Sequence, residues 1–202
     1  MTTTDRTYGG VSASARVADR RAALREACLD IVGEQGPLAV SAEAVCRGAG
    51  LAKRYFYESY TDRDALLAAI LDDFLGALDA EVFAALEGQP KSRRPRIVAE
   101  LVVGGLTADA RIARLFAEGV AISALRERRD ATVERYALLL RDEVLPFRGS
   151  GEATPARHFA SWLLVAGATD AVCAWVNGRL DVDRDTLVEA MLTTALAVAR
   201  AT

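Results

Sequence analysis

Apolar residues recur every three or four positions along nearly the whole of this chain. That spacing puts them on one face of an α-helix, whereas a half-buried strand would alternate polar and apolar side chains. No segment of four to eight residues shows this strict alternation. The pattern therefore predicts an all-α protein.

Proline, glycine and capping residues divide this pattern into about nine helices. Gly36-Pro37 ends the first helix, because proline cannot continue it, and residues 88–95 form a loop with two prolines. Thr154-Pro155 opens another helix with a capping residue before a proline. The expected helices cover about residues 16–36, 41–47, 51–57, 62–87, 95–106, 109–117, 119–145, 155–178 and 183–200.

The lengths of these helices divide the chain into three parts. Residues 1–15 are rich in Thr, Ser and Gly, have no periodicity and are expected to form a disordered arm. Residues 16–61 contain one long helix and two short ones around a glycine-containing turn. Residues 62–202 contain the remaining helices. We therefore expect a small N-terminal domain and a larger helical C-terminal domain.

The charged residues are distributed unevenly along the chain. The net charge is −3 at pH 7, a sign that by itself disfavours a polyanionic partner such as DNA. Residues 1–60, however, carry eight Lys or Arg against seven Asp or Glu, while residues 61–202 carry seventeen against twenty-one. A nucleic-acid surface is therefore expected only at the N-terminal end.

Groups that could perform catalysis or bind a metal are scarce. Three cysteines and one histidine cannot supply a four-ligand zinc site in any ordinary spacing. His158 and Cys173 lie on one expected helix, and at about 1.5 Å per residue they are roughly 22 Å apart, too far for a nucleophile and its base. No glycine motif for binding phosphates is present. We therefore expect no enzyme, no metal and no cofactor.

The cysteines and the apolar segments indicate in which cellular compartment the protein is expected. The roles of Cys28, Cys46 and Cys173 stay open, but their apolar surroundings are typical of free thiols in a reducing compartment. Residues 1–10 lack the apolar stretch of a signal peptide, and Asp170 interrupts the longest nearly uncharged segment. We expect a cytoplasmic protein without a membrane partner.

Residues 40–67 carry the one pattern that points to a specific function. A helix of about two turns, capped by Ser41, is followed by a turn over residues 48–50 and by a second short helix with Lys53 and Arg54. This is the helix-turn-helix arrangement, in which the second helix enters the major groove of DNA. Lysine and arginine neutralise phosphates, and arginine can also donate two hydrogen bonds to guanine.

The run VSAEAVCRGAGLAKRYFYESYTDRDALL, residues 40–67, resembles the DNA-binding domain of the TetR family of transcriptional regulators. The turn, the aromatic residues and the start of the next helix match the family pattern in register. Cys46 stands where the family usually has Ala, Arg63 where it has Lys, and Arg54-Tyr55 where it has smaller residues. The last departure implies that this chain reads bases differently from better-known members.

The resemblance implies a role for each matching residue. The residues that it assigns to DNA are Lys53, Arg54, Tyr55, Tyr57 and Arg63, and the chemistry of helix starts adds Ser41 to this set. Tyr57 and Arg63 would contact phosphates, and residues 53–55 would face the groove. The start of the helix that Ser41 caps could bind a further phosphate.

Other cations and aromatic residues at this end have less specific roles. Arg16, Arg20 and Arg21 of the first helix could reach DNA or remain solvated. Phe56 and Tyr60 are expected in the core of the small domain.

A TetR-like protein would hold a small-molecule pocket and a dimer interface in residues 62–202. The candidate pocket residues are Phe74, Leu78, Phe116, Tyr136, Trp162 and Asp170. Aromatic residues at helical spacing are equally typical of a core, and Asp170, which we expect to be buried, could instead pair with an arginine or a helix dipole. The candidate interface residues are Phe159, Ala166, Gly167, Met191 and Val198.

Three functions remain open. The first is a homodimeric regulator that an apolar effector releases from a palindromic operator, most simply a repressor, although the fold could serve an activator. The long helix over residues 62–87 would then act as a rigid rod between pocket and DNA. The second is an all-α small-molecule-binding protein or enzyme with a vestigial helix-turn-helix, and the third is a protein-interaction adaptor. The operator, the effector and the regulated genes stay open.

Overall fold

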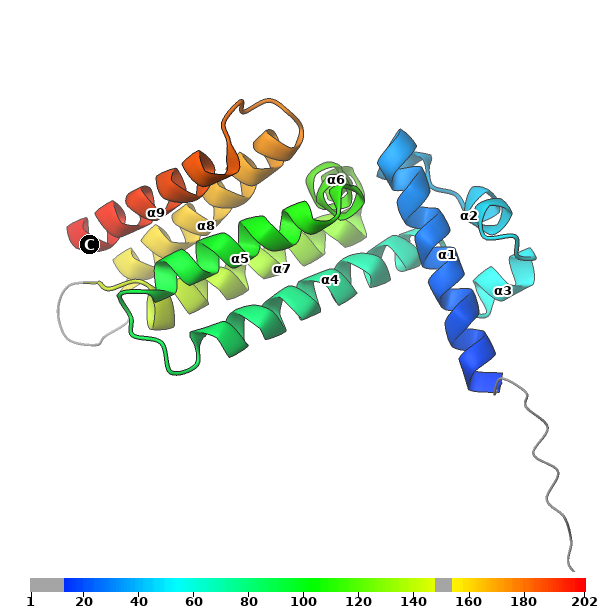
Figure 1. The fold of residues 1–202 in the computed structure, drawn as a ribbon, viewed down its shortest axis with the longest axis horizontal. Helices are drawn as coiled ribbons and strands as arrows, with labels where there is room; N and C mark the ends of the chain where they lie inside the picture. The colour runs from blue at the N-terminus through cyan, green and yellow to red at the C-terminus, as the bar shows by residue number, and fades with distance from the viewer. Residues whose placement is uncertain (1–12, 148–153) are drawn as a thin grey trace, which may run out of the picture.

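The structure, a computed structural model, describes residues 13–147 and 154–202. Every regular element in these ranges is helical, so the all-α prediction is confirmed. The helices, labelled in Figure 1, are α1 (Ala13–Gln35), α2 (Ala42–Gly48), α3 (Lys53–Tyr57), α4 (Arg63–Leu86), α5 (Arg94–Ala108), α6 (Ala110–Glu118), α7 (Ser123–Leu139), α8 (Pro155–Val176) and α9 (Arg184–Ala201). The shorter segments are the 3-10 turns η1 (Pro37–Ala39) and η2 (Gly119–Ala121) and the π-helical η3 (Leu140–Val144).

Two expected boundaries need correction. The first helix begins at Ala13, so residues 13–15 of the expected arm are helical, while residues 1–12 lie outside the described part of the chain. The helix expected over 119–145 is interrupted at both ends. It starts as the 3-10 turn η2, continues as α7 and widens into η3 shortly before Pro146; no proline within residues 119–145 marks these two changes.

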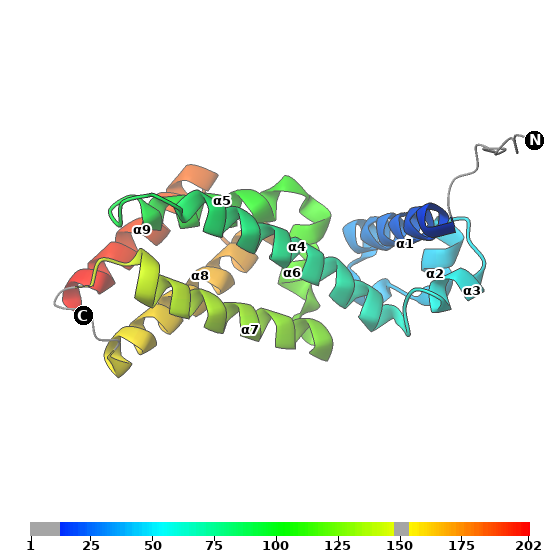
Figure 2. The same cartoon turned by 90° about the horizontal axis from the view of Figure 1, so that it is seen from below.

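The helices form two unequal groups that α4 joins, as Figures 1 and 2 show. Helices α1, α2 and α3 lie together at one end. Helices α5 and α7 pack against the rest of α4, and α8 and α9 lie on the far side of α5 and α7; the C-terminus lies at the end opposite α1–α3. Helix α6 sits between the groups and packs against both α1 and α8. The two ends of the molecule are therefore connected through α4 and through α6.

One hydrophobic core runs through both groups. It includes Leu24 and Phe56 at the small end, Leu66 at the start of α4, Leu115 of α6 and Val172 of α8, each almost completely buried. A second cluster fills the far end of the bundle between α4, α5 and α7. The buried core therefore continues across the domain boundary that we expect after residue 61.

Helix α8 is poorly covered on one side. The side chains of Phe159 and Leu163 are 64% and 55% exposed, and that of Trp162 is 43% exposed. Within the described ranges α8 is also the one helix with the length and apolar composition to cross a membrane, although core helices of soluble proteins pass the same test. An exposed apolar stripe of this kind commonly marks a surface that another molecule covers.

Candidate DNA-binding surface and ligand cavity

The helix-turn-helix forms as the sequence predicts. The Ser41 hydroxyl caps α2 by accepting a hydrogen bond from the Ala44 amide at 3.2 Å. Gly50 takes a φ of 64°, which glycine tolerates without strain, and the next amide, that of Leu51, donates to the Cys46 carbonyl at 2.9 Å. These local interactions fix the angle at which α3 leaves α2.

The side chains of α3 separate into a buried and an exposed set. Phe56 and Tyr60 are buried and their rings touch, with centroids 5.9 Å apart. Tyr57 lies between them in sequence and is 60% exposed. The structure therefore places Phe56 and Tyr60 in the core and leaves the Tyr57 phenol free to meet a partner molecule.

Lys53 and Glu43 form an exposed ion pair across the turn. The Lys53 ammonium lies 3.0 Å from a Glu43 carboxylate oxygen. The hydrogen bond from Lys53, together with its charge, lowers the pKa of Glu43, and the same contact raises the pKa of Lys53. Any DNA phosphate that binds Lys53 has to compete with this carboxylate.

Tyr55 lies between cations from two helices. The Arg54 Nη2 group donates to the Tyr55 hydroxyl at 2.6 Å, and its guanidinium carbon lies 4.6 Å from the ring centroid. The guanidinium of Arg20, on α1, also lies 4.6 Å from the same centroid. The side chain of Tyr55 is half-buried by these contacts.

Arg63 fastens the start of α4 to the small end of the molecule. Its Nη1 group donates to the carbonyls of Leu38 and Val40, both at 3.1 Å, and its Nε group pairs with Asp64 at 3.0 Å. A phosphate contact would thus use the remaining donors of a guanidinium that the fold already holds in place.

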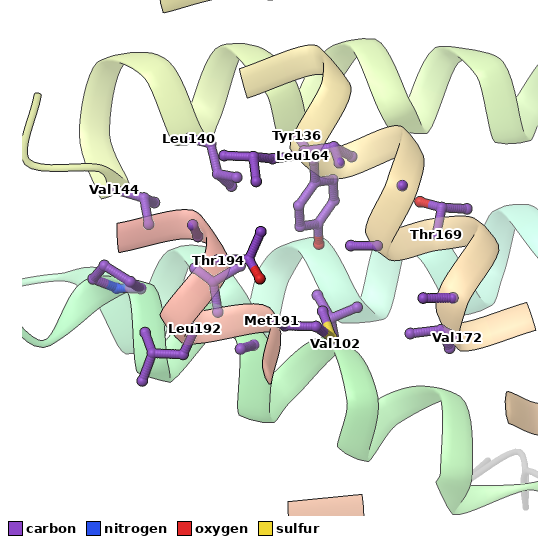
Figure 3. Close-up of a pocket in the computed structure, with 18 of the residues that line it drawn as sticks. Val102, Tyr136, Leu140, Val144, Leu164, Thr169, Val172, Met191, Leu192 and Thr194 are labelled. Carbon is purple, nitrogen blue, oxygen red and sulfur yellow. The ribbon is translucent and has the colours of Figure 1, made fainter. Parts of the chain in front are cut away.

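A largely apolar cavity of about 560 Å³ lies inside the helical bundle. Side chains from α4 to α9 line it, and Figure 3 shows several of them converging. Four of the six expected pocket residues are among them: Phe74, Leu78, Phe116 and Tyr136. The Tyr136 hydroxyl points into the cavity and is buried; in the described part of the chain it forms no hydrogen bond of good geometry, although the Asp79 carboxylate lies near it. Burial, reinforced by the negative charge of Asp79, raises the pKa of this phenol.

The other two expected pocket residues lie elsewhere. Trp162 faces outward on α8, and Asp170 is not buried: its side chain is 80% exposed and pairs with Arg129 of α7. The alternative of an arginine partner for Asp170 is therefore the one that the structure supports. An apolar helix such as α8 offers no sequence signal for which side faces the bundle, because both sides are apolar.

The expected interface residues fall into two groups. Phe159 and Gly167 are exposed on α8, where Ala166 is partly covered. Met191 and Val198, together with Gly167, line the cavity. Helix α9 thus contributes to the cavity wall, which sequence reasoning did not anticipate.

Sequence reasoning also missed a polar network between α6 and α1. Arg111 of α6 donates to Glu26 and Asp30 of α1, each at 2.7 Å, and to Asp109 at 2.9 Å. Arg114 donates to the Gly33 carbonyl at 2.9 Å. Hydrogen bonds from Arg111 lower the pKa of Asp109. These partners are more than 80 residues apart in sequence, except Asp109, so no local pattern could have revealed them.

The sequence and the fold of this chain can be compared with those of known proteins. No family model matches the chain. Over 74 residues it is 32% identical to the HTH-type transcriptional regulator BetI of Rhizobium meliloti, a stretch that covers 37% of this chain and 36% of the relative. The chain thus matches about a third of the length of this curated relative.

Solved structures match nearly the whole chain at low sequence identity. The fatty acid degradation regulator FadR from Bacillus halodurans superposes with a TM-score of 0.73 at 16% identity, over 88% of this chain and 94% of that one. A structure described as a TetR-family transcriptional regulator from Syntrophomonas wolfei superposes with a TM-score of 0.71 at 16% identity, over 90% of this chain and 95% of that one. FadR from Bacillus subtilis, in complex with stearoyl-CoA, superposes with a TM-score of 0.70 at 15% identity, over 88% of this chain and 98% of that one. The resemblance of residues 40–67 is confirmed at the level of the whole fold: the chain has the fold of the TetR-family transcriptional regulators.

Proposed function

We propose that this chain is a cytoplasmic, homodimeric DNA-binding transcriptional regulator that acts by binding rather than by catalysis, and that an apolar effector releases it from a palindromic operator. The observation that carries the proposal is a formed helix-turn-helix with exposed cations on α3, joined by one continuous helix to a large apolar cavity. We assign the DNA contacts to α2, α3 and the start of α4.

The dimer follows from the size of the recognition surface. Helix α3 has only five residues and can reach only a few base pairs, so a specific site requires two copies related by a two-fold axis. The exposed apolar stripe of Phe159, Trp162 and Leu163 on α8 is the surface that we assign to this contact. Small residues beside it, Ala166 and Gly167, would allow a second α8 to approach closely.

The cavity suits the apolar part of an effector, such as a long acyl chain, because its lining is largely apolar. A volume of about 560 Å³ lies within the usual range of about 300 to 1,000 Å³ for small-molecule sites. The stearoyl-CoA bound by the Bacillus subtilis structure of the same fold supports an acyl chain as a first candidate. The buried Tyr136 hydroxyl would then satisfy one polar atom of the ligand.

The two connections between the ends of the molecule give the ligand a way to act on DNA. Phe74 and Leu78 of α4 line the cavity, and the same helix begins at Arg63. Phe116 of α6 also lines it, on the helix whose Arg111 holds α1. A ligand that shifts α4 or α6 would change the separation of the two recognition helices in the dimer, so that both half-sites could no longer be bound.

A mobility-shift titration with the full chain and the DNA upstream of its own gene tests the proposal. We expect a shift at least about 1,000-fold tighter than with a random duplex of equal length and composition, reversed by stearoyl-CoA. In vitro transcription from the same DNA should fall when the protein binds. Equal affinity for both duplexes would refute a sequence-specific regulator.

Variants on α9 separate the role of the cavity from that of DNA binding. Met191→Trp should fill the cavity and remove the response to stearoyl-CoA while the DNA shift persists. Thr193→Trp, on the exposed side of the same helix, is the matched control and should keep the response. A full response in Met191→Trp would place the effector site elsewhere.

A further inference from the structure

Arg54 is an exposed residue at the start of the recognition helix, and its side chain already contacts Tyr55 in the absence of DNA. Its Nη2 group donates to the Tyr55 hydroxyl at 2.6 Å while its guanidinium lies 4.6 Å from the Tyr55 ring centroid. This hydrogen bond is the main cause that raises the pKa of Arg54 above its ordinary value. A free arginine would have to lose its rotamer freedom on binding DNA, whereas a fixed one has already lost it.

Tyr55 is itself held from the other side of the domain. The Arg20 guanidinium of α1 lies 4.6 Å from the same ring centroid, at a distance typical of a cation–π contact. Arg20 and Tyr55 are both half-buried, which limits the alternatives open to either side chain. The three residues therefore form one stack that joins α1 to α3.

The charges of this stack favour a polyanion as its partner. Two guanidinium groups share one aromatic ring, and in the described ranges neither forms an ion pair with a carboxylate. Two positive charges held against the same ring repel each other, and a nearby anion relieves that repulsion. The hydrogen bond to Tyr55 uses one hydrogen of Arg54 Nη2, which leaves the other Nη2 hydrogen and those of Nη1 and Nε to donate to DNA. Guanine O6 and N7 accept hydrogen bonds from two such adjacent donors.

We infer that Tyr55 is a positioning residue for sequence readout: its hydroxyl and ring hold Arg54 in the orientation that reads one base pair, and Arg20 of α1 holds the ring. The inference rests on the proposed DNA-binding function and makes it more specific. Tyr55 need not touch a base, and α1 takes part in recognition through Arg20 without entering the groove.

Selection of duplexes from a random library, followed by sequencing, tests this inference and does not require the operator to be identified first. Wild-type protein should enrich a palindromic motif, and Arg54→Ala should flatten one position in each half-site. Binding to the best duplex and to its variants at that position, at one fixed salt concentration, then gives a discrimination ratio, expected to be about 5- to 150-fold. Tyr55→Phe should reduce this ratio about three- to tenfold while binding to random DNA changes less than about twofold. Arg20→Met should reduce the ratio at the same position.

Two matched controls separate positioning from general contact. Tyr57→Phe removes a hydroxyl from the same helix and should weaken binding to every sequence alike, with the ratio unchanged. Arg16→Met removes a cation one turn before Arg20 and should leave the ratio unchanged. Far-ultraviolet circular dichroism and a thermal melt confirm that each variant is folded.

The outcomes distinguish this inference from the function on which it rests. If the wild type enriches no motif, the proposed regulator function is wrong. If it enriches a motif that Arg54→Ala flattens but Tyr55→Phe leaves intact, Tyr55 does not position Arg54 and only the present inference fails. A Tyr55→Phe variant that loses affinity equally for all duplexes would make Tyr55 a phosphate contact instead.

Discussion

Gly33 of α1 lies so close to Arg111 of α6 that a methyl group on Gly33 would come within 2.8 Å of the Arg111 Cγ atom. Cγ lies near the base of the arginine side chain, so it cannot move aside without moving the guanidinium. The absence of a side chain at Gly33 is therefore what lets Arg111 reach Glu26 and Asp30 on the same helix. A glycine inside a helix normally weakens it, and here it allows a contact between helices.

Gly33→Ala should destabilise the protein, although alanine is the better helix former. The crowding at Arg111 is expected to outweigh the gain in helix propensity and to lower the free energy of unfolding by about 1 kcal/mol. Urea denaturation measures the change. Gly76→Ala in α4 is the matched control, because its new methyl group meets nothing within 4 Å, and it should raise stability by about 0.5 to 1 kcal/mol. Equal stabilisation in both variants would show that Gly33 is not needed for the contact.

Arg111→Met should weaken the antagonism between effector and DNA. By linkage, stearoyl-CoA and operator DNA must lower each other's affinity by the same factor, commonly about 5- to 150-fold. Removing the ion pairs to α1 should reduce that factor, measured by titrating stearoyl-CoA with and without DNA. Arg96→Met is the control, because Arg96 pairs with Glu189 of α9 at 2.7 Å and does not touch α1. If both variants keep the wild-type factor, α6 plays no part in coupling.

Arg63→Ala should weaken binding to all DNA sequences to a similar degree. In the proposed complex the Arg63 side chain supplies one cation near the phosphate backbone of DNA. Its loss should therefore reduce the slope of log affinity against log salt concentration by about 1. The variant should also melt at a lower temperature, since the carbonyls of Leu38 and Val40 lose their shared donor. Lys91→Ala, which removes an exposed cation near the start of α5, should leave the salt slope unchanged. A loss of affinity confined to one sequence would instead make Arg63 a base contact.

Gly167→Glu should convert a dimer into a monomer. A side chain at Gly167 would meet nothing within 4 Å in the single chain, so the substitution should leave the protomer folded. Because Gly167 also borders the cavity, the molecular mass, and not the response to an effector, is the quantity that tests the interface. Light scattering after size-exclusion chromatography gives the mass. Phe83→Glu, at another exposed apolar residue on α4, should remain dimeric. A dimeric Gly167→Glu variant would move the interface away from α8.

The three cysteines should be unreactive in the folded protein. All three are buried, and burial raises the pKa of Cys28 to about 12 and also raises those of Cys46 and Cys173. At pH 8 only about one in ten thousand Cys28 thiols would carry the reactive thiolate. Ellman's reagent should therefore detect almost no thiol before unfolding and three afterwards. Rapid reaction of the native protein at this pH would show that the helices around the reacting cysteine open readily.

The helix-turn-helix could be predicted because its determinants are local. Ser41 caps α2, Gly50 makes the turn, and the alternation of buried Phe56 with exposed Tyr57 follows from helical spacing. The position of Asp170 could not be predicted, because α8 is apolar on both sides and only packing decides which side faces α7. The partners of Arg111 were equally hidden, since they lie in a helix 81 to 85 residues earlier.

The unbroken core sets a limit on how this molecule could be divided. Leu24 and Phe56 of the small end share one cluster with Leu66 of α4 and Leu115 of α6. A fragment cut at residue 61 would expose that part of the cluster to water, so it should not fold alone. A chimaera that transplants α3 onto another protein of this fold would therefore have to carry α4 and α6 with it, because those two helices supply the apolar side chains that cover the small end.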